Sequence, residues 1–146
     1  MRVIIQRVTS ATIEIDSTVT AAIGRGLVLL LGIAKKDSLR DADYLVEKIA
    51  GLRIFADEAG KMNLDVRHVG GSLLIVSNFT VYGDVRKGRR PGFDLAAPPA
   101  EARVIYDYFV ERARLTGIPV ETGSFQAHMK VELVNDGPIT LIAESI

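Results

Sequence analysis

Residues 26–34 read GLVLLLGIA, and this apolar run decides how the rest of the sequence is interpreted. It is the longest apolar run in the chain, yet it is far shorter than the ~20 residues that span a bilayer. Glycine opens the run and recurs near its end, which is typical of a buried strand. We therefore place a central strand at Leu27–Ile33 and build the fold outward from it.

A helix and a second apolar strand follow this run. Ser38, with Asp41 three residues later, is typical of a capping box, and apolar residues then recur at helical spacing. The next strongly apolar segment is Leu73–Val76. The order strand, helix, strand predicts one crossover unit. The long connection from Arg53 to Gly71 argues against direct pairing of the two strands.

A second helix and further strands complete the pattern. Pro98-Pro99 opens the helix, because proline suits the first helical turn, and Gly117 with Pro119 ends it. We expect the remaining strands at Arg2–Val8, Thr12–Ile15, Val19–Ile23, Met129–Leu133 and Ile139–Ala143, with turns at Thr9-Ser10 and Asn135–Pro138. The sequence thus predicts an α+β fold, a twisted and mostly antiparallel sheet or partial barrel with two helices on one side.

Composition sets the limits on function. The 146 residues, 48% of them apolar, predict a single domain over residues 1–146. The 18 basic residues equal the 18 acidic ones, so any contact with nucleic acid must come from a local patch. Cysteine is absent, which excludes disulfides and thiolate chemistry. Met1–Thr9 lacks the layout of a signal peptide, so we expect a cytoplasmic protein without a membrane partner.

Three segments carry candidate chemistry, and the first leaves the strand at Leu73–Val76. It reads Ser77-Asn78-Phe79-Thr80. Its side chains can orient a substrate, and its backbone N–H groups can stabilise an oxyanion. A nucleophilic Ser or Thr needs a base, and the sequence offers no evident one. The alternative is a strand that turns polar as it reaches the surface.

The second segment is basic, and the third is a turn. Arg86, Lys87, Arg89 and Arg90 crowd into a loop that suits either phosphate contacts or plain solvation. Asn135-Asp136-Gly137-Pro138 is a turn by default, but a cis bond before proline would make it a rigid backbone element. His68 and His128 lack metal-ligand spacing, so we expect no metal and no cofactor.

Together, in this order and spacing, the three segments resemble the D-aminoacyl-tRNA deacylase family. The resemblance covers essentially the whole chain and includes Ile23–Leu27, Leu52–Phe55, Gly60–Asn63 and Val134–Thr140. It implies a cofactor-free hydrolase that cleaves the ester between a D-amino acid and the 3′ end of tRNA. Such an enzyme proofreads chirality in translation, rejects L-aminoacyl esters and lets glycyl-tRNA through.

The resemblance also implies roles for residues. The family is a homodimer in which Gly137-Pro138, with a cis bond, would enter the partner's site and leave no room for an L side chain. Arg7 would brace that motif. Ser77, Phe79 and Thr80 would form the catalytic segment, Asn78 and Met129 would contact substrate, and Arg86, Lys87, Arg89 and Arg90 would bind tRNA, not DNA. The tRNA's own 2′-hydroxyl, rather than Thr80, would help to activate water.

Two departures and three rival functions accompany this assignment. Asn78 replaces the common glutamine and Gly92 the common serine. A relative that edits L-alanine on tRNA would carry a trans Gly-Pro bond. A non-catalytic RNA-binding module would depend on the loop Arg86–Arg90 alone. An oligomeric scaffold would need Gly137 only for stability.

Overall fold

The computed structural model describes residues 1–146. In chain order its elements are β1 (Arg2–Ile15), β2 (Thr18–Ile23), β3 (Gly26–Gly32), α1 (Leu39–Ala50), β4 (Phe55–Ala56), β5 (Met62–Leu64), β6 (Ser72–Ser77), the 3-10 helix η1 (Phe79–Tyr82), α2 (Pro99–Leu115), β7 (Val120–Thr122) and β8 (Lys130–Glu144). A six-stranded sheet runs in the order β2-β1-β3-β6-β7, with β8 paired to β1. β4 and β5 form a separate hairpin.

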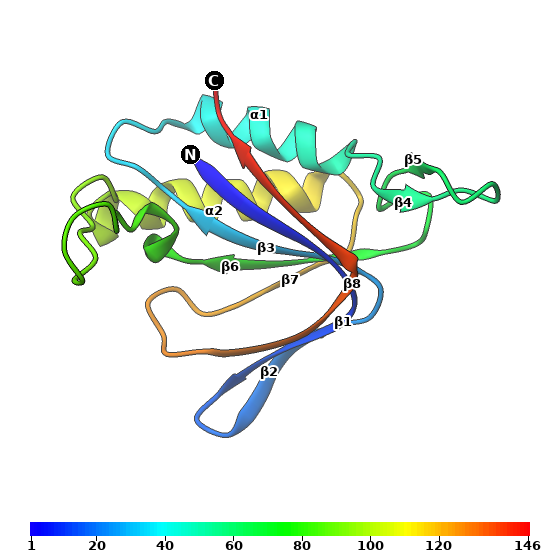
Figure 1. The fold of residues 1–146 in the computed structure, drawn as a ribbon, viewed down its shortest axis with the longest axis horizontal. Helices are drawn as coiled ribbons and strands as arrows, with labels where there is room; N and C mark the ends of the chain where they lie inside the picture. Colours follow the sequence, from blue (N-terminus) through cyan, green and yellow to red (C-terminus); the bar gives the residue numbers. More distant parts are fainter.

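The long strand β1 pairs with three others. Its residues Arg2–Val8 pair with β3, its residues Ala11–Ile15 pair with β2, and β8 follows its other edge along both halves. The sheet therefore changes direction at the middle of β1 and curls into a nearly closed barrel, as Figure 1 shows. The α+β fold expected from the sequence is confirmed.

Two expected turns are bulges inside continuous strands instead. The turn at Thr9-Ser10 was wrong, because the register of β1 against β8 shifts there without a break in pairing. The turn at Asn135–Pro138 likewise lies inside β8, which runs unbroken from Lys130 to Glu144. A bulge bends a strand while keeping it in the sheet, so polar residues at a bend need not end a strand.

β3 and β6 pair directly and in parallel, against the expectation drawn from their long connection. The hairpin β4-β5 takes up much of that connection, so the crossover through α1 still returns the chain beside β3. β7, which the sequence did not reveal, adds a second parallel pair at the far edge of β6. The sheet is thus antiparallel around β1 and parallel around β6.

Both helices cover one face of the sheet, side by side (Figure 1). At the start of α1 the Asp41 carboxylate accepts a hydrogen bond from the Ser38 N–H at 2.8 Å, as the capping box predicts. The main core lies between helices and sheet around Phe55, Phe109 and Leu29. A smaller core fills the inside of the curled half. Neither helix is long and apolar enough to cross a membrane.

The close approach of β3 and β6 generates a test of stability. A Cβ added at Gly26 would lie 1.9 Å from the Ser72 carbonyl oxygen, a backbone atom that cannot turn away. We expect Gly26→Ala to lower the free energy of unfolding by about 3 kcal/mol or more. Gly24→Ala is the matched control, because no atom lies within 4 Å of its added Cβ. Urea unfolding of both variants checks this, and equal stabilities would contradict it.

Candidate active site

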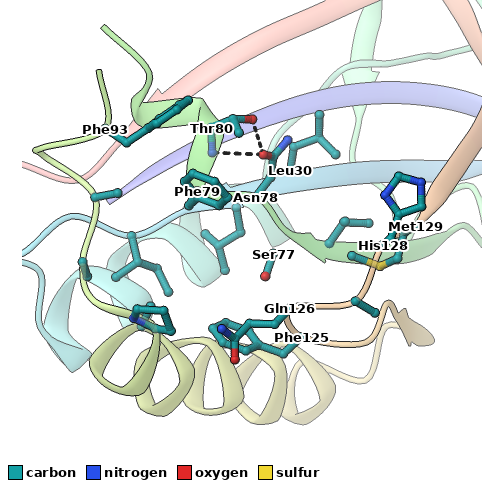
Figure 2. Close-up of a pocket in the computed structure, with 18 of the residues that line it drawn as sticks. Leu30, Ser77, Asn78, Phe79, Thr80, Phe93, Phe125, Gln126, His128 and Met129 are labelled. Carbon is teal, nitrogen blue, oxygen red and sulfur yellow. Dashed lines mark hydrogen bonds between the residues drawn. The ribbon is translucent and has the colours of Figure 1, made fainter. Parts of the chain in front are cut away.

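A cavity of about 760 Å³ opens where β6 ends and η1 begins. One wall is formed by Ser77–Thr80, the opposite wall by the segment after β7 and the start of β8, and the floor by the strand β3 and the start of α2. Of its 19 lining residues 13 are hydrophobic, so it is an apolar pocket with a few polar groups on its rim. Figure 2 shows this arrangement.

Ser77 is the last residue of β6, and its hydroxyl points into the open space of the pocket (Figure 2). The apolar strand before it is buried, so the change from apolar to polar residues coincides with the point where β6 reaches the cavity. The polar segment singled out in the sequence therefore lines a pocket. It is more than a strand that becomes polar at the surface.

Asn78 holds the next turn of chain in place. It is the N-cap of η1, and its Oδ1 accepts a hydrogen bond from the Thr80 N–H at 3.1 Å. The same Oδ1 also accepts a hydrogen bond from the Thr80 hydroxyl (Figure 2). Asn78 therefore acts on the shape of the wall, because its Oδ1 is engaged by Thr80.

This capping decides which polar groups of the segment remain available. The Thr80 N–H and O–H both donate to Asn78, and the Val81 N–H donates to the Asn78 carbonyl. Phe79 opens η1, and the first N–H groups of a helix have no partner inside it. Of the backbone N–H groups that the sequence offered for an oxyanion, the Thr80 N–H is bonded to Asn78 in this structure.

Aromatic rings frame the mouth of the pocket. The Phe79 side chain is 60% exposed, and its ring meets Phe93 edge to face with centroids 5.0 Å apart. A large exposed ring held by a second ring is a ready surface for a planar apolar group. Phe93 lies beyond the basic loop in the sequence, and nothing in the sequence pattern indicated that it would return to Phe79.

The far wall brings in residues that sequence reasoning missed. Phe125, Gln126 and His128 line the pocket, and Gln126 adopts a left-handed backbone conformation with φ of 64°. His128 is exposed and joins the wall although its spacing gave no sign of a site. Met129 lines the pocket and also packs on the smaller core.

Few side chains at the pocket can act as a general acid or base. His128 is the only lining residue with an imidazole, and no carboxylate lines the cavity. Tyr106 lies behind Phe125 and donates its hydroxyl hydrogen to the Ile75 carbonyl, and burial raises the pKa of Tyr106 to about 12. No three histidine, cysteine or carboxylate side chains converge as ligands of a metal ion.

The basic loop around Arg86–Arg90 lies beside the pocket, and backbone hydrogen bonds join its two ends. Asp84 and Gly92 exchange two backbone hydrogen bonds of 2.8 and 2.9 Å, so Gly92 contributes through its backbone. The Asp84 carboxylate forms an ion pair with the Arg86 guanidinium, with Oδ2 and Nη2 2.7 Å apart. This pair holds the pKa of Asp84 well below its usual range. Lys87, Arg89 and Arg90 remain exposed, and no ion pair neutralises them. The free charge of the loop therefore rests on those three.

Arg7, Gly137 and Pro138 form a second cluster, and none of them lines the pocket. The Gly137–Pro138 peptide bond is cis, as the resemblance implied, and both residues are exposed. The Arg7 side chain is only 13% exposed, and its Nε lies 3.1 Å from Asp136 Oδ2. Its Nη1 donates to the Ile54 carbonyl at 2.6 Å. Arg7 thus ties the segment around Gly137 to the chain before β4.

Comparison with known proteins places this geometry in a family. The family model described as D-Tyr-tRNA(Tyr) deacylase matches residues 4–144. A D-aminoacyl-tRNA deacylase from Geobacter sulfurreducens is 59% identical over 99% of this chain and 95% of its own length. One from Symbiobacterium thermophilum is 54% identical over 99% of this chain and 96% of its own length.

Solved structures share the fold. A structure titled c-Myc DNA Unwinding Element Binding Protein matches with a TM-score of 0.94 and 39% identity, over 100% of this chain and 99% of its own. A structure titled as a probable eukaryotic D-amino acid tRNA deacylase matches with a TM-score of 0.84. It is 17% identical and covers 98% of both chains, so it supports the fold alone.

Proposed function

Because this chain belongs to the D-Tyr-tRNA(Tyr) deacylase family, we propose that it hydrolyses the ester bond of D-aminoacyl-tRNA at the pocket beside η1. The observation that carries this assignment to particular residues is the wall Ser77–Thr80, where Asn78 caps η1 and the Ser77 hydroxyl points into an apolar cavity. Because aminoacyl-tRNA is used where translation occurs, the proposal also places the chain in the cytoplasm, which cell fractionation would check.

Hydrolysis of the ester requires that negative charge developing on the carbonyl oxygen be stabilised. Water adds to the ester carbonyl carbon, the carbonyl oxygen becomes an oxyanion, and collapse releases the 3′ oxygen of tRNA, which takes up a proton. We assign the Phe79 N–H, the first of η1 and without a partner inside that helix, as the donor for that oxyanion. The free Ser77 hydroxyl in the pocket orients the substrate.

Thr80 is poorly suited to attack the ester. Its hydroxyl hydrogen is donated to the Asn78 amide oxygen, which is an acceptor and too weak a base to remove that proton. No carboxylate lines the cavity to take that role. The one imidazole of the lining, His128, lies on the wall opposite Thr80. We assign the proton of the attacking water to the neighbouring 2′-hydroxyl of the terminal ribose, which passes its own proton to the departing 3′ oxygen.

Chiral selection is assigned to Gly137 and Pro138 of a second copy. In one chain these residues are exposed and lie outside the pocket, which supports the proposal that they belong to the site of a second copy. The flanking strand presents apolar side chains to solvent, with Val134 56% and Ile142 67% exposed, which suits burial against another copy. The Gly137–Pro138 backbone would then stand against the α-carbon of the substrate and exclude an L side chain, while glycine would pass.

The first test compares three esters with one protein. Protein treated with a metal chelator is incubated separately with D-tyrosyl-tRNA, L-tyrosyl-tRNA and glycyl-tRNA, and the loss of each ester is followed. We expect the D-ester and the glycyl ester to be hydrolysed at least roughly a hundredfold faster than the L-ester. If all three esters survive, the assignment to D-aminoacyl-tRNA is wrong, and L-alanyl-tRNA is tested next. Its loss would favour the alanine-editing relative, and its survival would favour binding of RNA through the basic loop.

A complementation experiment tests the shared site. Phe79→Ala combined with Thr80→Ala removes the pocket wall. Gly137→Val blocks the motif, because its side chain would fill the space of the substrate's α-carbon, and the φ of 121° also disfavours any side chain there. Each protein alone should be inactive on D-tyrosyl-tRNA. After mixing by unfolding and refolding, about half of the dimers are mixed and each holds one intact site, so about a quarter of wild-type activity returns. No recovery would show that the two clusters do not work across chains.

The loop is tested through its salt dependence. Replacing Lys87, Arg89 and Arg90 together with Ala should raise KM for tRNA roughly tenfold at physiological salt and flatten the dependence of KM on salt. Arg86→Ala is the control, because Asp84 already neutralises that guanidinium and its effect should be smaller. A loss of kcat with KM unchanged would contradict a role in tRNA contact.

A further inference from the structure

The Gly137–Pro138 motif sits in a large bulge of β8. Gln6 of β1 pairs with Thr140, and Val8 pairs with Asn135. Arg7 alone therefore faces the whole stretch from Asp136 to Ile139. A stretch of this length, forced out of the ladder, has lost its regular interstrand hydrogen bonds, so its shape must be fixed by something else.

Asn135 lies at the start of this bulge, and its side chain joins the two ends of the bulge. Its Nδ2 donates to the Arg7 carbonyl across the strand pair at 2.9 Å and to the Ile139 carbonyl at the far side of the bulge, also at 2.9 Å. One amide group thus uses both of its N–H donors to join the two ends of the bulge to β1. Its Oδ1 accepts from the Thr140 hydroxyl at 3.3 Å, so every hydrogen-bonding atom of the side chain has a partner.

We propose that Asn135 is a positioning residue, which sets the chiral selectivity of the reaction by holding Gly137 and Pro138 in a fixed place. The inference rests on the proposed function, because it assigns a cause to the selectivity of that same site. The Arg7 side chain holds the bulge from one side through Asp136 and Ile54. Asn135 holds it from its start through the Arg7 backbone.

The two holds differ in chemistry. The Arg7 Nε is buried and has no aligned hydrogen-bond acceptor, so its contact with Asp136 is an ion pair without directional constraint. The two Asn135 bonds are directional and end on backbone carbonyls, which move only if the strand moves. Asn135 therefore fixes the backbone of the bulge through directional bonds, while Arg7 holds the bulge at Asp136 through charge.

An isosteric substitution separates these roles. Asn135→Asp keeps the size and shape of the side chain but puts a carboxylate oxygen, which donates no hydrogen bond, opposite two carbonyl oxygens. Asn135→Ala removes both donors without adding charge. Because a misplacement of about 1 Å is enough to spoil a reacting geometry, we expect the ratio of D-tyrosyl- to L-tyrosyl-tRNA hydrolysis to fall at least roughly tenfold in both variants. KM for tRNA should not change, because the basic loop lies elsewhere.

A second readout reports on the bulge itself. Hydrogen–deuterium exchange of the peptide covering residues 135–140 should become faster in both variants, while exchange of β3 stays as in the wild type. Asn63→Asp is the control, since it makes the same chemical change at an exposed amide that bonds Asp57 on the β4-β5 hairpin. That variant should leave both the selectivity and the exchange of residues 135–140 unchanged.

The outcomes are distinct. Faster exchange together with lower selectivity supports the inference. Unchanged selectivity in Asn135→Ala, whatever its exchange, overturns it, and so does unchanged exchange. If Asn135→Asp fails to fold, Asn135→Ala carries the test alone. If the wild-type protein does not hydrolyse D-tyrosyl-tRNA, the proposed function is overturned, and the inference that rests on it is overturned as well.

Discussion

The pairing of β1 with three strands is the constraint on which the rest of the structure depends. Its first half belongs with β3 and its second half with β2, while β8 follows it along the other edge. A strand shared in this way must bend at its middle, and the sheet must curl with it. The bend requires irregular pairing at that point, and both shifts in the register of β1 against β8 occur around Val8. The bulge that carries Gly137 and Pro138 is one such irregularity.

Curling also separates the two functional clusters. The pocket lies where β6 ends beside α2 and the basic loop, whereas the bulge lies at the bend of β1 and β8, at the other side of the ribbon in Figure 1. A site that needs both must therefore draw them from two copies. The exposed apolar side chains of β8, Val134 and Ile142 among them, give a second copy a surface to cover. In the proposed function, assembly and selectivity would then depend on the same strand.

In the proposed function the site works mainly through fixed backbone groups. Asn78 caps η1 and accepts hydrogen bonds from the Thr80 N–H and hydroxyl, and the Phe79 N–H is the group proposed for charge developing on the substrate. At the bulge, Asn135 donates hydrogen bonds to two carbonyl groups. In both places an asparagine side chain fixes the backbone that the proposal sets against the substrate. The replacement of the common glutamine by Asn78 suits this role, because the shorter side chain reaches its own turn and caps it.

By itself, the sequence determined the local features whose cause is local. The apolar run at Leu27–Ile33 had to be a buried strand, Ser38 with Asp41 had to begin a helix, and the Ser77–Thr80, Arg86–Arg90 and Gly137–Pro138 segments identified the family. Only the tertiary structure decided that β3 and β6 pair in parallel, that polar residues in β1 and β8 are bulges, and that Phe93, Phe125 and His128 join Ser77 at one cavity. Those facts depend on contacts between residues far apart in the chain, and no pattern of neighbours records them. Periodicity reports which face of an element is buried, whereas register and pocket walls depend on what the other elements bring to that face.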